Sequence, residues 1–135
     1  MRYLGIDWGE KRIGLSLGDD ETRIASPLIV VKNLEEVCRI IKNEGVEAVV
    51  VGRPLSIINY RLSIANKDYN NFLKKLEDKN NLPIYEIDER LSSKAADALT
   101  GGKYRNSERD MVAAMVILQS FFDQMDAGKY FKQVS

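Results

Sequence analysis

Two apolar segments are joined by a short polar turn in residues 3–18, YLGIDWGEKRIGLSLG, and this stretch decides the fold. It predicts two consecutive strands, the first of which ends at Asp7. Gly9 permits a tight backbone turn there, and Lys11 and Arg12 place positive charge beside the acid. A carboxylate in this setting suits a site that handles phosphate and a divalent metal. Asp7 is therefore the first candidate for chemistry.

Length and composition fit one soluble domain over residues 1–135, with about 126–135 as a frayed tail. The chain has 135 residues, of which 44% are apolar, enough for a sizeable core without disulfides. A single cysteine, Cys38, cannot form an internal disulfide. Charges at Arg2 and Asp7 leave no room for a signal peptide, and no apolar run approaches the roughly 20 residues of a membrane helix. We expect a cytoplasmic protein.

The charge balance restricts both partners and chemistry. Twenty basic and twenty acidic residues cancel, so any nucleic-acid binding needs a local basic patch rather than bulk charge. The sequence contains no histidine, which removes the usual general base and the commonest zinc ligand. Hydrolysis, if present, must therefore depend on carboxylates and metal.

Hydrophobic periodicity predicts an α/β fold. Strands are expected at residues 2–7, 12–18, 27–31, 46–51 and 83–88. Helices are expected from the Asn33 cap to Gly45, over 61–79, from Ser92 or Ser93 to Leu99, and from the Ser107 cap onwards. Short connections make the first three strands an antiparallel meander, and the helical crossover before 46–51 predicts a mixed sheet covered by helices.

Apolar spacing also predicts which helix faces are buried. Cys38 lies on the apolar stripe of the first helix and is expected in the core. For the last helix, the predicted apolar face consists of Met111, Met115, Leu118, Phe122 and Met125. With Ser107 as the cap, Asp110 takes the third helical position, where an acid is favoured by the helix dipole whatever else it does.

Three acids can meet at one edge of the predicted sheet. Ligands of open α/β sheets favour the crevice beyond the carboxyl ends of strands. Asp7 ends the first strand, Glu89 follows the last strand, and Asp110 begins the last helix. Each acid also has a purely structural interpretation: Asp7 bonded to turn amides, Glu89 in a solvated charged turn, and Asp110 at a helix start.

Four segments resemble the YqgF/RuvX-type family of Holliday-junction resolvases and pre-rRNA-processing nucleases. They are GIDWGEKRIG (5–14), VGRPL (51–55), DERLS (88–92) and DMVAAMVIL (110–118). The first alone is weak, because ATPases of the actin and sugar-kinase type have similar hairpins, but the ordered set is specific. The chain departs from the family at residues 56–59, where relatives often have a glycine-containing polar loop, and at Arg109.

The resemblance implies an RNase H-like fold, with a five-stranded mixed sheet of three antiparallel and then two parallel strands, flanked by helices. It implies Asp7, Glu89 and Asp110 as an acidic triad that binds Mg²⁺ or Mn²⁺. The reaction would be metal-assisted phosphodiester hydrolysis with one or two ions, about 3.5–4 Å apart if two are bound. Products would carry 5′-phosphate and 3′-hydroxyl ends.

Basic residues near these acids are expected to bind substrate phosphates. They are Lys11, Arg12, Arg53, Arg90 and Arg105, with Lys103 and Arg109 in the same regions. Such contacts give affinity and register without base specificity. Any one of them, taken singly, is more often an ordinary solvated charge.

Several alternatives stay open at this stage. The substrate is the 5′ flank of a pre-16S rRNA or a four-way DNA junction, and symmetric cutting of a junction requires a dimer, so the chain is a monomer or a homodimer. A module that binds structured nucleic acid without cutting it is a second class of function. An ATPase of the actin type needs two such halves, for which 135 residues are too few.

Overall fold

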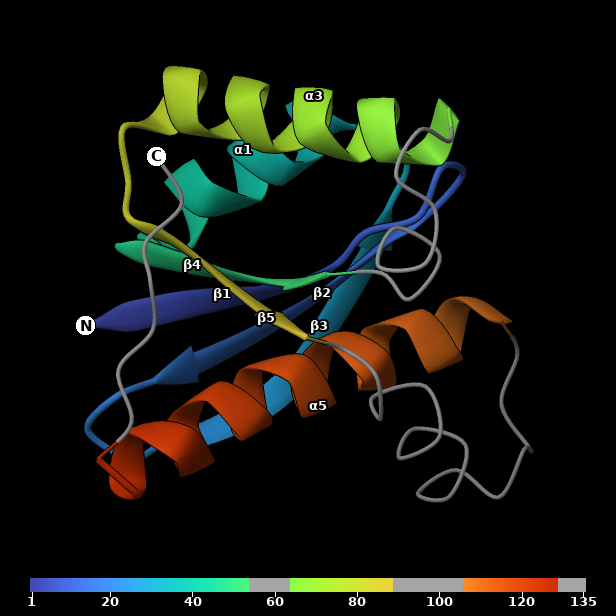
Figure 1. The fold of residues 1–135 in the computed structure, drawn as a ribbon. Helices are drawn as coiled ribbons and strands as arrows, with labels where there is room; N and C mark the ends of the chain where they lie inside the picture. Colours follow the sequence, from blue (N-terminus) through green and yellow to red (C-terminus); the bar gives the residue numbers. More distant parts are fainter. Residues whose placement is uncertain (54–63, 89–105, 129–135) are drawn as a thin grey trace.

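The computed structural model describes residues 1–53, 64–88 and 106–128 (Figure 1). Its strands are β1 (Arg2–Asp7), β2 (Ile13–Asp19), β3 (Ile24–Val31), β4 (Ala48–Arg53) and β5 (Ile84–Asp88). Its helices are α1 (Leu34–Asn43), α3 (Ile64–Asn80) and α5 (Asn106–Asp126). The short helix predicted to end at Leu99 lies outside these residues. None of the helices described is long and apolar enough to cross a membrane.

The strands form one sheet in the order β3-β2-β1-β4-β5. β2 pairs antiparallel with both β1 and β3. β4 pairs parallel with β1, and β5 pairs parallel with β4. The predicted mixed sheet, with three antiparallel strands followed by two parallel ones, is therefore confirmed. β1 lies at its centre, and Asp7 is the last residue of β1.

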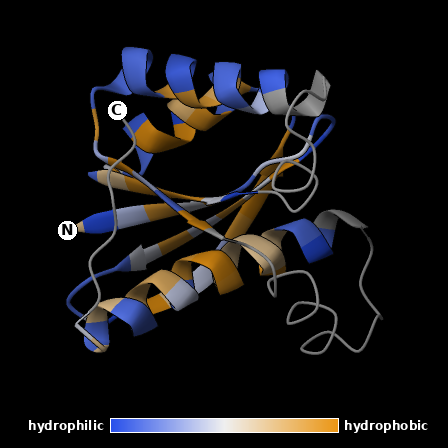
Figure 2. Ribbon diagram, in the orientation of Figure 1, coloured by the Kyte–Doolittle hydropathy of each residue, from blue (hydrophilic) through white to orange (hydrophobic). Residues whose placement is uncertain are grey.

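Helices cover both faces of this sheet, α1 and α3 on one side and α5 on the other (Figure 1). Leu4, Ile6 and Val49 belong to the core under α1 and α3, whereas Tyr3 and Val50 belong to the core under α5. Figure 2 shows the apolar sides of the helices turned toward the strands. Because side chains alternate along a strand, the odd-numbered residues of β1 face α5.

Several element boundaries agree with the sequence. The Asn33 side chain accepts a hydrogen bond from the Glu36 amide at 3.0 Å, as expected of an N-cap. Gly45 follows the end of α1 with a φ of 63°, a backbone conformation that favours glycine. The predicted start of the third strand was late: β3 begins at Ile24, three residues before 27. β3 is an edge strand, and its first residue, Ile24, is 64% exposed, so the beginning of the strand carries no continuous buried apolar run.

The predicted apolar face of α5 was right at Leu118 and Phe122, which are fully buried, and wrong at its three methionines. Met111, Met115 and Met125 are only partly buried. The residues of α5 that are buried are Ala113, Ala114, Ile117, Leu118, Phe121 and Phe122. The helix thus turns small residues as well as large ones toward the sheet, and these allow it to come close. Cys38, expected in the core, is also only half-buried, and its sulfur lies 3.3 Å from the Asn80 amide nitrogen.

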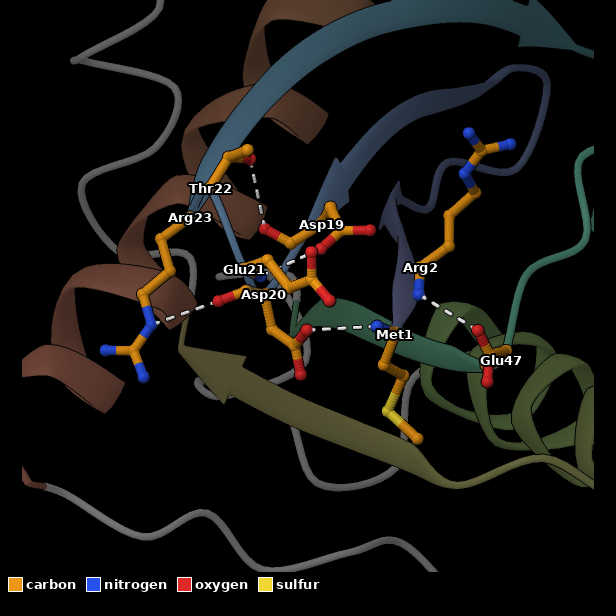
Figure 3. A network of polar contacts seen from close by, with 8 residues as sticks. All are labelled: Met1, Arg2, Asp19, Asp20, Glu21, Thr22, Arg23 and Glu47. Atoms are coloured by element: carbon orange, nitrogen blue, oxygen red, sulfur yellow. Dashed lines mark hydrogen bonds and ion pairs between the residues drawn. The ribbon is translucent and has the colours of Figure 1, made fainter.

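Polar contacts link the amino end of β1 to neighbouring parts of the chain (Figure 3). The Met1 ammonium donates to Asp20 at 3.0 Å, and this hydrogen bond raises the pKa of the amine. The turn between β2 and β3 carries further bonds, among them that from the Glu21 amide to the Asp19 carboxylate at 2.8 Å. These contacts hold the end of β1 that lies away from Asp7.

Candidate metal centre and nucleic-acid interface

Asp7 is half-buried at the carboxyl end of β1 and faces α5. Its register partners are Gly14 on β2 and Gly52 on β4. Paired residues on adjacent strands point to the same face of a sheet, and glycine has no side chain. Neither strand neighbour therefore covers the carboxylate from within the sheet.

Asp110 lies directly against Gly14. A β-carbon built on Gly14 would stand 2.1 Å from the Asp110 carbonyl oxygen and 3.0 Å from the Asp110 β-carbon. Gly14 is also the antiparallel partner of Asp7, and β-carbons of such partners are about 5 Å apart. The β-carbons of Asp7 and Asp110 are therefore at most about 8 Å apart. Two carboxylates from opposite ends of the chain meet at this edge of the sheet.

This meeting follows from how α5 packs on β2. Residues four apart along the helix face the sheet: Asp110, Ala114 and Phe122 lie against β2, and Leu118 lies against Gly5 of β1. The strand contributes every second residue, and we call these three positions the helix seat: Gly14, Ser16 and Gly18. From Asp110 to Ala114 the helix advances about 6 Å, and from Gly14 to Ser16 the strand advances about 6.6 Å, so the two elements are in step at this end. The contacts of Asp110 with Gly14 and of Ala114 with Ser16 thus set the position of Asp110.

The middle of the helix seat is tied by a buried hydrogen bond. The Ser16 hydroxyl donates to the Ala114 carbonyl oxygen at 2.7 Å, and Ser16 is completely buried. A β-carbon on Gly5 would stand 2.3 Å from the Ser16 oxygen and 2.8 Å from the Ala114 oxygen. Glycine at position 5 is therefore required by the close approach of the helix.

Arg12 forms an ion pair with Asp110. Its Nε lies 2.8 Å from the Asp110 Oδ2, although the two residues are 98 positions apart in sequence. The Arg12 side chain is 46% exposed and that of Asp110 is 25% exposed. Gly9 belongs to the turn that presents Arg12: a β-carbon there would stand 2.7 Å from the Arg12 carbonyl oxygen. The sequence suggested a role for each residue but not their contact.

The other predicted phosphate-binding residues differ in position. Lys11 is exposed in the same turn as Arg12. Arg53 is exposed at the end of β4, where strand alternation directs it toward the α3 face, away from Asp7. Glu89, Arg90, Lys103 and Arg105 lie outside the described residues. Arg109 precedes Asp110 on α5 and is half-buried.

α5 begins at Asn106, so Ser107 lies inside the helix instead of capping it. Asp110 is then the fifth helical residue, beyond the first turn that carries Glu108. A carboxylate that far along gains less from the helix dipole, whose effect is confined to the first turn. The purely structural interpretation of Asp110 is weakened accordingly.

The donor set suits a hard divalent cation. Carboxylate oxygens are the ligands of Mg²⁺ and Mn²⁺, and Mg²⁺ is often held by one or two carboxylates together with water and substrate phosphates. Within 1–53, 64–88 and 106–128 no three acidic, histidine or cysteine side chains form a metal-binding group. Asp7 and Asp110 are the two acids that the helix seat brings together, and they fit such an ion.

An aromatic contact below the site was not anticipated. Trp8 follows Asp7 and packs edge-on against Tyr69 of α3, with ring centroids 5.5 Å apart. The Tyr69 hydroxyl donates to Glu86 of β5 at 2.5 Å. Glu86 pairs with Val51, whose side chain is in the core under α1 and α3, so this acid faces away from Asp7. The contact supports the strand ends and adds no third carboxylate to the site.

Comparisons with known proteins show the family of this chain. Residues 1–124 match the model of the family described as RuvX, Holliday junction resolvase. A protein of Methylobacillus flagellatus, named "Putative pre-16S rRNA nuclease", is 37% identical over 131 residues, covering 89% of each chain. A protein of the same name from Maridesulfovibrio salexigens is 35% identical over 132 residues, covering 90% of this chain and 97% of its own.

Solved structures with the same fold include resolvases. RuvC of Thermus thermophilus in complex with a Holliday junction superposes with a TM-score of 0.62 at 20% identity, covering 99% of both chains. A Fowlpox virus resolvase bound to junction DNA gives a TM-score of 0.59 at 12% identity, covering 93% of this chain and 99% of that one. Both likenesses establish the RNase H-like fold, and the family match together with the curated relatives establishes that this chain belongs to the RuvX family.

Proposed function

We propose that this protein is a metal-dependent endonuclease that hydrolyses phosphodiester bonds in the 5′ flank of a 16S rRNA precursor. The observation that carries the proposal is the contact of Asp110 with Gly14, the strand partner of Asp7. Membership of a family of nucleases gives the class of reaction, and the chain is accordingly a hydrolase acting on nucleic acid. The names of its curated relatives suggest the RNA substrate.

Asp7 and Asp110 would hold the divalent cation, with Glu89 as a third ligand, and Mg²⁺ or Mn²⁺ is the proposed ion. Such an ion, when bound, activates a water molecule and stabilises charge on the phosphoryl oxygens. Asp7 supplies a donor on the most central strand, where packing on both faces fixes its position. Asp110 supplies a donor whose backbone is fixed by the helix seat. The protein thus contributes positioned charge, the larger part of catalysis in phosphoryl transfer.

Phosphate binding is the proposed role of the exposed cations around the site. Lys11 and Arg12 share the turn beside Asp7, which places two positive charges where a bent or looped strand would pass. Arg53 would contact the strand further from the acids, and Arg90 and Arg105 complete the proposed set. Binding through these groups is independent of base sequence and weakens with salt, with a slope set by the number of contacts.

A four-way DNA junction is the second candidate substrate, because the description of the matching family names it. The two substrates separate in one experiment. End-labelled precursor RNA and a synthetic junction are incubated with Mg²⁺, Mn²⁺ or EDTA and with wild type, Asp7→Asn or Asp110→Asn. We expect cutting of the RNA in either metal, none in EDTA and none by the variants. If the junction is cut in preference to the RNA, branched DNA becomes the proposed substrate and a homodimer becomes the proposed assembly.

Loss of cutting must also be separated from loss of binding, because a module that only binds nucleic acid would cut nothing. Asp7→Asn removes a negative charge next to phosphate, so the variant should bind the RNA as tightly as wild type or more tightly. If wild type binds the RNA but cuts neither substrate in either metal, the nuclease proposal fails. A product with a 3′-phosphate would also contradict the proposed metal-assisted mechanism.

A further inference from the structure

We propose that Arg12 occupies the Asp110 carboxylate while no metal is bound, and that a divalent cation displaces it, releasing the guanidinium to bind a phosphate of the nucleic acid. The proposal rests on the proposed function, which it deepens by coupling metal binding to substrate binding. It begins from the 2.8 Å contact between Arg12 Nε and Asp110 Oδ2, a contact to one of the proposed metal ligands.

Asp110 is the partner with the fixed backbone. Its carbonyl oxygen and β-carbon lie against the Gly14 backbone, and Ala114 and Phe122, further along α5, are packed on Ser16 and Gly18. Interiors of this density resist small displacements. A metal that binds Asp110 must therefore bind within reach of its side chain from this position, beside the guanidinium that already contacts Oδ2.

Arg12 is the partner that can move. It belongs to the turn between β1 and β2, outside either strand, and its side chain is 46% exposed. It joins Asp110 through Nε, and an exposed ion pair of this kind is weak. An arginine presents five donors, so the two terminal nitrogens suit a phosphate once the carboxylate is taken.

Charge supports the exchange as well. With the guanidinium in place, Asp110 is already neutralised, so an incoming cation competes with a positive group at contact distance. When the cation takes Asp110, the guanidinium loses its counter-charge and is left beside the substrate path with Lys11. Metal and nucleic acid should then each strengthen the binding of the other, and the coupling is reciprocal.

The first test is calorimetric titration of Mn²⁺ into wild type, Arg12→Gln and Lys11→Gln. Both variants lose one positive charge from the same turn, but of the two residues replaced, Arg12 is the one that contacts Asp110. Arg12→Gln should bind Mn²⁺ about fivefold more tightly than wild type, because the metal no longer has to break an ion pair between two unit charges, worth about 1 kcal/mol in water. Lys11→Gln should change the affinity by less than half of that on a logarithmic scale.

The second test measures binding of a labelled RNA hairpin in EDTA and in Ca²⁺, with the RNA checked on a denaturing gel. In EDTA, Arg12 is engaged with Asp110 by a weak ion pair, so Arg12→Gln should lose less RNA affinity than it loses in Ca²⁺. In Ca²⁺, Arg12→Gln should bind more weakly than wild type. Lys11→Gln should weaken binding equally under both conditions.

Three results would overturn the exchange. Weaker Mn²⁺ binding by Arg12→Gln would mean that the arginine only orients Asp110 for the metal. Equal changes of Mn²⁺ affinity in Arg12→Gln and Lys11→Gln would mean that the effect comes from the net charge of the turn and not from the contact between Arg12 and Asp110. A loss of RNA affinity in Arg12→Gln that is the same in EDTA as in Ca²⁺ would show that the contact with Asp110 does not reduce the binding of RNA by the guanidinium. Failure of the proposed function looks different, because then wild type cuts neither the RNA nor the junction in Mg²⁺ or Mn²⁺, whatever its affinity for Mn²⁺.

Discussion

Replacement of Gly14 by alanine is the sharpest perturbation that the fold offers. The added methyl group would stand 2.1 Å from the Asp110 carbonyl oxygen and 2.4 Å from its carbonyl carbon. A carbon and an oxygen ordinarily approach no closer than about 3.3 Å, so the start of α5 must retreat by about 1 Å. The atoms in the way belong to backbone, and a side-chain rotation therefore cannot relieve the contact.

Two effects of different size should follow from Gly14→Ala. Overpacking of this kind costs about 1–3 kcal/mol of unfolding free energy. Displacement of a catalytic group by about 1 Å costs on the order of 100-fold in rate. Metal affinity should fall as well, because Asp110 moves away from Asp7. The loss of activity is therefore expected to exceed what partial unfolding explains.

Gly18→Ala is the matched control. Its methyl group would meet the Phe122 ring at 2.6 Å and the Ile24 carbonyl oxygen at 2.9 Å, at the other end of the helix seat. The two glycines are four strand residues apart, about 13 Å, so Gly18→Ala should destabilise the fold without moving Asp110. Urea unfolding, Mn²⁺ titration and RNA cleavage are measured for both variants. Equal activity of the two variants at equal stability would refute the claim that the helix seat positions Asp110.

The remaining predictions concern the polar contacts. Asp110→Asn should abolish cleavage while RNA binding, followed by fluorescence anisotropy, stays equal or becomes tighter; weaker binding would contradict the account. Tyr69→Phe removes the 2.5 Å bond to Glu86 and should cost about 1.5–3 kcal/mol in urea unfolding, as for other bonds to charged groups. The Met1 amine has its pKa raised above 8.0 by the bond to Asp20, so its stabilisation is complete below about pH 8 and is lost as pH rises through the raised pKa. Unfolding measured from pH 7 to 10 should show this decline in wild type and lose it in Asp20→Asn.

The sequence was most informative where strong local patterns coincide. The hairpin over 3–18 has alternating strands, a turn and an acid at the strand end, and the structure has β1, β2 and Asp7 in those places. The parallel addition of β4 followed from an apolar run after a helix, and the family resemblance implied the second parallel strand, β5. The proximity of Asp7 and Asp110 was expected from topology, and the structure brings Asp110 against the strand partner of Asp7.

Tertiary contacts account for what the sequence did not predict. Met111 and Met115 have helical spacing and apolar side chains, yet α5 turns Ala113 and Ala114 inward because the small residues of β2 admit a close backbone. Which face of α5 is buried depends on the strand that the helix covers. The spacing of apolar residues along the helix carries no information about that strand. The Arg12 contact joins residues 98 positions apart and has no local signal at all.

The central claim is that one divalent cation binds between Asp7 and Asp110. The most direct measurement is a titration of the ¹⁵N-labelled protein with Mn²⁺, which broadens amide signals near the ion. The account predicts that the signals of Trp8, Gly14 and Asp110 broaden together at the lowest Mn²⁺ concentrations, that those of Asp20 and Glu21 persist, and that Asp7→Asn abolishes the effect. Broadening that begins elsewhere, or that survives unchanged in Asp7→Asn, would contradict it.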